Sequence, residues 1–264
     1  MEDNYLEINK KTWNKRTAVH VESEFYDNET FLNGRSSLNS IELDLLGDLK
    51  GKKVLHLQCH FGQDSISLSR LGAQVTGVDF SDVAIEKARE MAQKMEVDTS
   101  FICCDVYSLP EILNEKFDIV FTSYGTIAWL PDINKWGSVV SHFLKSEGHF
   151  VFAEFHPVVW MFDSEFKSVK YHYFNVEAII EESEGTYTDG GDDMRNTEIS
   201  WNHAISDVVN SLINSNLELI SLEEYDYSPY HCFANMVQDT PGEYVISTLK
   251  RRIPMVYSIL ARKK

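Results

Sequence analysis

The sequence predicts an α/β fold, in which a doubly wound, mostly parallel, seven-stranded sheet has helices on both faces and an antiparallel last strand. Short apolar, branched runs alternate with stretches of helical periodicity through residues 38–157. Parallel neighbours need a crossover, usually a helix, so this alternation is typical of a parallel sheet covered on both faces. Aromatic, β-branched and acidic residues follow at 160–201, with a glycine-rich turn at 189–191, and predict a β-hairpin insertion.

Each element has its own local pattern. Leu38, Ile41, Leu45 and Leu49 have helical spacing, and Gly51 follows them as a helix-ending residue. Further helices are predicted at 64–71, 82–95, 134–144 and 206–214. Strands are predicted at 53–57, 74–79, 99–103, 117–122, 149–154, 217–223 and 254–261. The first two strands and the helix between them form a β-α-β unit.

Charge and composition exclude several classes of protein. The formal net charge of −17 repels phosphate backbones, so DNA, RNA and anionic membranes are poor partners. No apolar run approaches the roughly 18 residues of a membrane span, and residues 1–11 have no apolar secretory core. The four cysteines have no C-x-x-C spacing, which predicts free, reduced thiols. We therefore expect a cytoplasmic protein that binds no nucleic acid and no membrane.

The turn after the first strand is the first place to look for a ligand, because open α/β sheets bind ligands beyond the carboxyl ends of their strands. A dinucleotide site has the pattern G-x-G-x-x-G, in which the glycines let the backbone approach a pyrophosphate. Here only Gly62 is retained, and Gln58 and His60 stand where two glycines would be. A nucleoside with a sulfonium and an amino-acid tail needs no phosphate cradle. The turn therefore favours S-adenosylmethionine over NAD.

Acidic residues follow two further strands of the predicted sheet. Asp79 ends the second strand, where a carboxylate can accept both ribose hydroxyls, and Phe80 can lie against the adenine ring. Asp105, followed by Val106, is placed to accept the adenine amino group. Asp79 could instead cap the helix that begins near Ser81, and Asp105 could instead begin a turn. The position of both carboxylates at strand ends favours the ligand interpretation.

These elements, together with Ser123 and Tyr124 after the fourth strand, resemble the Rossmann-like class I S-adenosylmethionine-dependent methyltransferases over residues 53–156. The form LQCHFGQDS, residues 57–65, looks like a small-molecule branch of that family. His56 stands where the family usually has an acidic residue. The resemblance implies methyl transfer to a small molecule and the cofactor S-adenosylmethionine. Its implied cofactor-binding residues are Gln58, His60, Gly62, Gln63, Asp79, Phe80, Asp105, Val106, Ser123 and Tyr124.

Three histidines are candidates for a general base, because their unperturbed pKa values lie closest to neutral. They are His20, His156 and His203, and each alone is more often structural. Glu154 and His156 share one face of a strand, but no second His or Cys pair lies nearby, so we predict no metal site. Substrate contacts are predicted from Trp13, Tyr26, Trp129, His156, Trp160 and Tyr187. Tyr124 and Trp129 could also be ordinary core aromatics.

We expect residues 1–264 to form a single methyltransferase domain. Its predicted parts are an N-terminal lid at 1–37, a cofactor-binding core at 38–157, a cap insertion at 158–203 and the C-terminal part of the sheet at 204–264. The lid and the cap would complete the pocket, because loops and insertions finish pockets in open α/β folds. Two alternatives remain, an NAD(P)-dependent oxidoreductase and a non-catalytic protein that binds S-adenosylmethionine or S-adenosylhomocysteine. A monomer and a homodimer are both compatible with the sequence.

Overall fold

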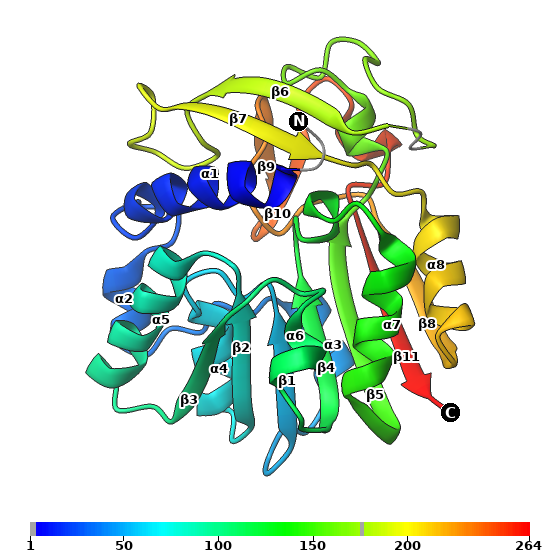
Figure 1. Ribbon diagram of the computed structural model, residues 1–264. Coiled ribbons are helices and arrows are strands. Elements are labelled where there is room, and N and C mark those ends of the chain that lie inside the picture. Colours follow the sequence, from blue (N-terminus) through cyan, green and yellow to red (C-terminus); the bar gives the residue numbers. More distant parts are fainter. Residues whose placement is uncertain (1–3, 175–176) are drawn as a thin grey trace.

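The computed structural model describes residues 4–174 and 177–264, so residues 1–3 of the predicted lid and residues 175–176 of the predicted cap lie outside the described residues (Figure 1). The helices are α1 (Tyr5–His20), α2 (Asn28–Leu32), α3 (Ser40–Leu46), α4 (Gln63–Arg70), α5 (Asp82–Lys94), α6 (Leu109–Ile112), α7 (Ile133–Phe143) and α8 (Ile205–Asn214), with short 3-10 helices η2 (Ile127–Trp129), η3 (Val159–Met161) and η4 (Lys250–Arg252). The strands are β1 (Lys53–Leu57), β2 (Gln74–Asp79), β3 (Thr99–Cys103), β4 (Phe117–Ser123), β5 (Leu144–Phe155), β6 (Ile179–Glu184), β7 (Arg195–Ser200), β8 (Leu217–Tyr225), β9 (Met236–Thr240), β10 (Glu243–Ile246) and β11 (Val256–Lys263).

The main sheet confirms the predicted fold class. Among the described residues it has seven strands in the order β3-β2-β1-β4-β5-β11-β8. β1 lies parallel to both β2 and β4, with Val54 opposite Val75 on one side and Ile119 on the other. The last strand, β11, runs antiparallel to both β5 and β8. The strand order reverses at β1, so the crevice between the carboxyl ends of β1 and β4 is the topological switch point.

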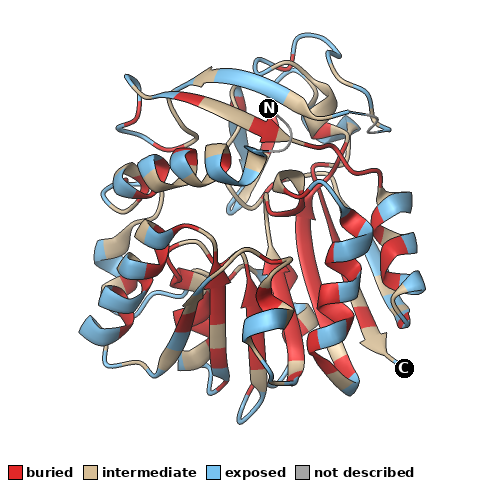
Figure 2. Ribbon diagram, in the orientation of Figure 1, coloured by how far each residue is buried: buried red, intermediate tan, exposed pale blue. Residues whose placement is uncertain are grey.

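Helices cover both faces of this sheet, as the alternating pattern predicts. Leu55, Val120 and Phe152 face a core cluster that includes Trp136 of α7. Val54, Phe121 and Val151 belong to a second cluster, which includes residues of α3 and α4. Figure 2 shows that buried residues concentrate in the strands, while the outer sides of the helices are exposed. Burial on both faces explains why β1 and β4 read as continuous apolar runs.

Helix α1 lies across the carboxyl ends of the sheet strands, below the β6–β7 hairpin (Figure 1). The side chain of Asn9 donates to Ile199 O (2.7 Å) and accepts from Ile199 N (3.0 Å), as if it were a residue of a neighbouring strand. Thr12 Oγ1 also donates to Thr197 O (2.9 Å). On its other side α1 contacts the start of α5, where Lys10 forms an ion pair with Asp82 (2.8 Å). α1 therefore joins the hairpin to the edge of the sheet.

Several elements differ from the sequence predictions. β9 and β10 form a second hairpin that was not predicted, although Pro241 and Gly242 between them are a turn signal. The short helices α2 and α6 were also missed, because helices of this length have little periodicity to read. β5 begins at Leu144 rather than at 149, since α7 passes directly into the strand without a loop. Of the described helices, none has both the length and the apolar character needed to cross a bilayer.

The close approach of α7 and α8 gives a stability prediction. A Cβ at Gly137 would lie 2.7 Å from Ser211 Oγ and 2.9 Å from Ser211 O. Gly→Ala in an exposed helix stabilises by up to about 1 kcal/mol, but here the contact with a backbone oxygen should reverse the sign. We expect Gly137→Ala to lower the free energy of unfolding by about 1–3 kcal/mol in urea denaturation. Ser138→Ala on the exposed side of α7 is the control and should change it by less than about 0.5 kcal/mol. A Gly137→Ala protein as stable as the parent would contradict this packing.

Candidate active site

The turn after β1 keeps the backbone shape of a glycine-rich turn although it has only one glycine there. Gln58, His60 and Gly62 all have left-handed backbone angles, with φ of 56°, 50° and 84°. A left-handed non-glycine residue costs roughly 1–2 kcal/mol, and such strain concentrates at functional sites. Gln58 Nε2 donates to Thr126 O (2.8 Å), and the His60 backbone N–H donates to Asp79 Oδ2 (2.9 Å). Hydrogen bonds to the neighbouring strand ends thus hold the turn in this shape.

Gly62 and Gln63 begin α4 and have structural contacts of their own. A Cβ at Gly62 would lie 2.8 Å from the Phe101 ring and 2.9 Å from the Cβ of Ala88. Glycine is therefore required there both by its backbone angle and by the packing of α4. Gln63 Nε2 donates to Tyr26 O (2.9 Å) and to Asn28 Oδ1 (2.7 Å). These bonds tie the segment before α2 to the start of α4.

Asp79 lies at the carboxyl end of β2, where the sequence placed it. Its two carboxylate oxygens accept from the backbone N–H groups of His60 (2.9 Å) and Ser81 (2.9 Å), and burial raises its pKa to about 6. The N-cap of α5 is Ser81, whose hydroxyl accepts from Ala84 N (3.0 Å), so Asp79 is not the helix cap. Each carboxylate oxygen has a second lone pair, so Asp79 can still accept hydroxyl groups of a ligand.

Asp105 and Val106 follow β3, beside Phe80. Asp105 Oδ1 accepts from Tyr107 N (2.9 Å) and Ser108 N (3.2 Å), as expected of a residue that begins a turn. Val106 is buried in the core cluster under α7, and Phe80 is half-buried. Asp105 thus stabilises its own loop, and its second carboxylate oxygen remains for a ligand.

Two carboxylates that the sequence interpretation missed, Glu42 of α3 and Asp64 of α4, contact the residues at the end of β4. Tyr124 has a left-handed backbone (φ 36°), and its hydroxyl donates to Glu42 Oε2 (2.8 Å). The neighbouring Ser123 Oγ donates to Asp64 Oδ2 (3.2 Å). Burial, followed by the charge of Asp64, raises the pKa of Glu42 to about 7. The pattern Asn39-x-x-Glu42 is a capping-box signal that could have identified this helix start.

Glu154 fixes the loop that follows β4. Its carboxylate accepts from the backbone N–H groups of Gly125, Thr126 (2.7 Å) and Ile127 (3.2 Å), and from Thr126 Oγ1 (2.9 Å). A fully buried carboxylate needs such a set of donors, because an unpaired buried charge is costly. Glu154 therefore positions the backbone between β4 and η2, and it does so from the end of the neighbouring strand β5.

Two of the three histidine candidates make their hydrogen bonds with structural partners. His156 Nε2 bonds to Glu224 Oε1 (2.9 Å), and its Nδ1 accepts from Val158 N (3.1 Å). His203 Nε2 donates to Leu130 O (2.7 Å).

Trp160, predicted as a substrate contact, packs against Phe155 and Phe233, with ring centres 5.9 and 5.4 Å away.

The third candidate, His20, joins α1 to the β1 turn. Phe61 N donates to His60 Nδ1 (2.8 Å), so in the neutral ring the His60 proton is on Nε2, which donates to His20 Nδ1 (3.0 Å). His20 Nε2 then donates to Thr186 Oγ1 (2.7 Å) in the predicted cap. Burial lowers the pKa of His20 to about 2 and that of His60 to about 3. Both rings are therefore neutral, and they connect α1, the β1 turn and the loop between β6 and β7.

Tyrosine rings surround the space above the β1 turn. Tyr26 OH and Tyr187 OH are 2.5 Å apart, and Tyr124 and Tyr230 meet edge to face with ring centres 5.1 Å apart. Burial is the main cause of the raised pKa values of all four hydroxyls, so these tyrosines stay protonated at neutral pH.

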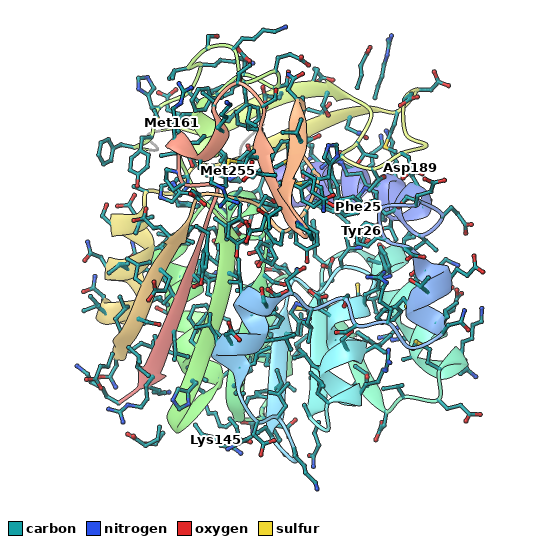
Figure 3. The ribbon with its side chains drawn as sticks, turned by 180° about the vertical axis from the view of Figure 1, so that it is seen from behind. Phe25, Tyr26, Lys145, Met161, Asp189 and Met255 are labelled. Atoms are coloured by element: carbon teal, nitrogen blue, oxygen red, sulfur yellow. The ribbon has the colours of Figure 1, made fainter. Side chains whose placement is uncertain are left out.

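Figure 3 shows Phe25 and Tyr26 beneath Asp189, whose carboxylate accepts from Glu24 N (3.1 Å) and Phe25 N (3.3 Å). A surface cavity beside Lys145, by contrast, lies at the opposite edge of the sheet (Figure 3).

The structure thus brings Trp13, His20, Tyr26 and Tyr187 to the β1 turn, where Gln58 and His60 were already expected. Trp13 meets His60 and Trp129 edge to face, with ring centres 5.3 and 5.4 Å away. The residues that the sequence interpretation missed are Arg16, Glu42, Asp64, Thr186 and Tyr230. Tyr230 comes from the loop between β8 and β9, and no local pattern connects that loop with the first strand.

Comparison with known proteins gives the family. Residues 48–211 match the methyltransferase domain family, and the chain belongs to this family. A ubiquinone biosynthesis O-methyltransferase of Alkalilimnicola ehrlichii is 31% identical over 120 residues, which are 44% of this chain and 48% of that protein. The chain therefore spans about half the length of this curated relative.

Solved structures show the same fold. An S-adenosylmethionine-dependent methyltransferase from Mesorhizobium loti superposes with a TM-score of 0.58 at 20% identity, over 88% of this chain and all of that chain (100%). Geranyl diphosphate C-methyltransferase from Streptomyces coelicolor, solved with S-adenosylhomocysteine, superposes with a TM-score of 0.57 at 14% identity, over 84% of this chain and 76% of that chain. The predicted family and fold are confirmed, and S-adenosylmethionine is the methyl donor of this class.

The residues above the strand ends fit such a donor. Within the described part of the chain, Gln58 Oε1 and Trp13 Nε1 are buried without hydrogen-bond partners. Buried polar atoms are nearly always paired, so these two, which lie beside the strand ends, are available to a ligand. Asp79 and Asp105 each have free acceptor capacity at neighbouring strand ends, which suits ribose and adenine groups.

The raised pKa of Glu42 gives a pH prediction. A carboxyl with a folded pKa of about 7 and an ordinary unfolded pKa of 4.5 stabilises the folded protein when protonated, and this contribution is lost as the pH rises through 7. Gln is neutral at every pH, so the stability of Glu42→Gln relative to the parent should increase between pH 4.5 and 8, by roughly 2–3 kcal/mol. Chemical denaturation across this range measures it. A difference that is constant with pH would show that Glu42 has an ordinary pKa.

Proposed function

We propose that this protein transfers a methyl group from S-adenosylmethionine to a small-molecule acceptor by in-line displacement. The observation that carries the proposal is the β1 turn, in which Gln58, His60 and Gly62 have left-handed angles beside Asp79 and beneath α1. Side chains at positions 58 and 60 would obstruct a pyrophosphate, which argues against the NAD(P)-dependent oxidoreductase alternative. Membership of the methyltransferase domain family supports the same choice.

In this proposal the ends of β2 and β3 hold the nucleoside. Asp79 accepts the ribose hydroxyls with the lone pairs that His60 N and Ser81 N leave free. Asp105 accepts the adenine amino group, and Phe80 and Val106 flank the ring. Gln58, His60, Gln63, Ser123 and Tyr124 border the amino-acid tail, and the sulfonium supplies the electrophilic methyl carbon.

The acceptor lies beneath the lid and the cap in this proposal. Trp13, Tyr26, Trp129 and Tyr187 border its site, whereas the Trp160 ring packs against Phe155 and Phe233. Transfer needs the acceptor atom in line with the methyl carbon and water excluded, so positioning contributes most. Of the three candidate histidines, His20 is the one beside Trp13, Tyr26 and Tyr187, but its lowered pKa makes it a weak base. We therefore assign His20 a positioning role between the turn and the cap.

We also propose that the predicted parts 1–37, 38–157, 158–203 and 204–264 act as lid, cofactor-binding core, cap and C-terminal part of the sheet. The net charge of −17 supports an acceptor other than nucleic acid. The cytoplasmic location that we propose rests on residues 1–11, which have no apolar secretory core. A monomer and a homodimer remain equally compatible with the proposal.

Ligand binding tests the proposed function. Calorimetry should show binding of S-adenosylmethionine and S-adenosylhomocysteine and none of NAD or NADP. Asp79→Asn should lower the affinity for S-adenosylmethionine and for S-adenosylhomocysteine by about 10- to 100-fold, because charge-assisted hydrogen bonds contribute roughly 1.5–3 kcal/mol. Asp98→Asn, an exposed aspartate before β3, is the control and should bind like the parent. Tight NAD binding without binding of either sulfur nucleoside would overturn the assignment.

Turnover separates an enzyme from a non-catalytic binding protein. We expect methyl-labelled S-adenosylmethionine to yield S-adenosylhomocysteine and a labelled product with at least one member of a panel of phenols, amines and thiols. Cofactor binding without any labelled product over the whole panel would favour the non-catalytic alternative.

Hydrogen exchange tests the lid. Amides between Asn14 and Tyr26 should exchange more slowly when S-adenosylhomocysteine is bound, because closure over a ligand stabilises the contacts of α1 with the turn and the cap. Amides of β11, remote from the turn, are the internal control and should not change. Identical exchange at residues 14–26 with and without the ligand would show that α1 is fixed packing rather than a lid.

A further inference from the structure

Three buried polar atoms without partners lie on side chains that meet where α1 covers the sheet. In the part of the chain that the structure describes, Trp13 Nε1, Arg16 Nε and Gln58 Oε1 have no hydrogen-bond partner. An unpaired buried donor or acceptor costs about 1–3 kcal/mol. Several such atoms in one place indicate a site that a ligand completes rather than a packing defect.

Contacts between the side chains show that they share one location. The guanidinium carbon of Arg16 is 5.4 Å from the ring centre of Trp13 and 5.8 Å from that of Trp129. Gln58, in the β1 turn, donates to Thr126 O, three residues before Trp129. The site is therefore built from α1, the β1 turn and η2, the elements that enclose the proposed methyl-transfer site.

Arg16 is the charged member of this group. Its side chain is only 9% exposed, and its Nη2 donates to Glu198 Oε1 on β7. That bond orients the guanidinium and leaves Nε without an acceptor. A guanidinium N–H and an indole N–H are both donors only, so their natural partner is an oxygen atom with lone pairs. A carboxylate offers two such oxygens and forms strong, charge-assisted bonds with arginine.

We propose that Trp13 and Arg16 form a carboxylate-binding subsite beside Gln58. This inference rests on the proposed function and names the chemistry of one part of that site. The carboxylate comes either from the amino-acid end of the methyl donor or from the acceptor. Gln58 Oε1 accepts an N–H or O–H of the same ligand.

Two variants remove one unpaired donor each. Trp13→Phe keeps an aromatic ring but has no indole N–H, and Arg16→Lys keeps the charge beside Glu198 but lacks Nε. Trp136→Phe is the matched control, because Trp136 Nε1 is also buried without a partner but lies in the core between Phe150 and Phe152. Among the described residues neither removed donor is paired, so a fall in melting temperature with Trp13→Phe would reflect lost packing of the ring and not a lost hydrogen bond.

Three probes distinguish the sources of the carboxylate. S-adenosylhomocysteine has the amino-acid tail, 5′-methylthioadenosine lacks it, and benzoate added to the S-adenosylhomocysteine complex is a separate carboxylate. If the methyl donor supplies the carboxylate, Trp13→Phe and Arg16→Lys should lower the affinity for S-adenosylhomocysteine by about tenfold. The affinity for 5′-methylthioadenosine should then be unchanged. If the acceptor supplies it, both nucleosides bind normally and benzoate binding falls by about tenfold. Trp136→Phe should alter none of these affinities.

Other results overturn the subsite. If the variants lose affinity for S-adenosylhomocysteine and for 5′-methylthioadenosine equally, they disturb the lid in general. Unchanged nucleoside binding together with unchanged or absent benzoate binding would mean that no carboxylate is held there. A parent protein that binds neither S-adenosylmethionine nor S-adenosylhomocysteine would instead refute the proposed function, so the two failures are distinguishable.

Discussion

β1 pairs with β2 along one edge and with β4 along the other, and every part of the candidate site depends on this central position. Parallel pairing brings the carboxyl ends of the three strands to the same edge of the sheet. The β1 turn can then bond to Asp79 after β2 and to Thr126 after β4. These bonds hold Gln58 and His60 in left-handed angles that side chains seldom adopt. The shape of this turn therefore depends on strand pairing. In a glycine-rich turn, by contrast, the glycines adopt such angles without help from neighbouring strands.

Burial shifts the titratable groups around this turn toward their neutral forms. It raises the pKa values of Glu42 and Asp79 and lowers those of His20 and His60, because the charged form of each loses its hydration. Hydrogen bonds to backbone N–H groups oppose the shift of the two carboxyls. The side chains around the turn therefore lie in a medium of low polarity, in which electrostatic interactions are weakly screened. In such a medium the placement of a few donors and acceptors determines which ligand fits.

The upper wall of the site comes from segments that are far apart in the sequence. α1 reaches the β6–β7 hairpin through Asn9 and Thr12, and His20 extends the contact to Thr186 and His60. Tyr230, between β8 and β9, completes the ring of tyrosines. These hydrogen bonds join α1, the β1 turn and the segment around the β6–β7 hairpin, across separations of up to 190 positions in the sequence.

The first three strands of the core can be predicted from local sequence patterns alone. Strand bounds at 53–57, 74–79 and 99–103 were predicted as they occur, because buried parallel strands read as short apolar runs between helical patterns. The position of Asp79 at the end of the second strand was also predicted, because it follows from the strand bounds. Tertiary structure decided the rest. The roles of Arg16, Glu42 and Glu154 arise from partners 182, 82 and 29 positions away, and periodicity carries no information over such separations. Local sequence selects strands and helices, whereas long-range packing decides which buried polar groups are paired and which are left for a ligand.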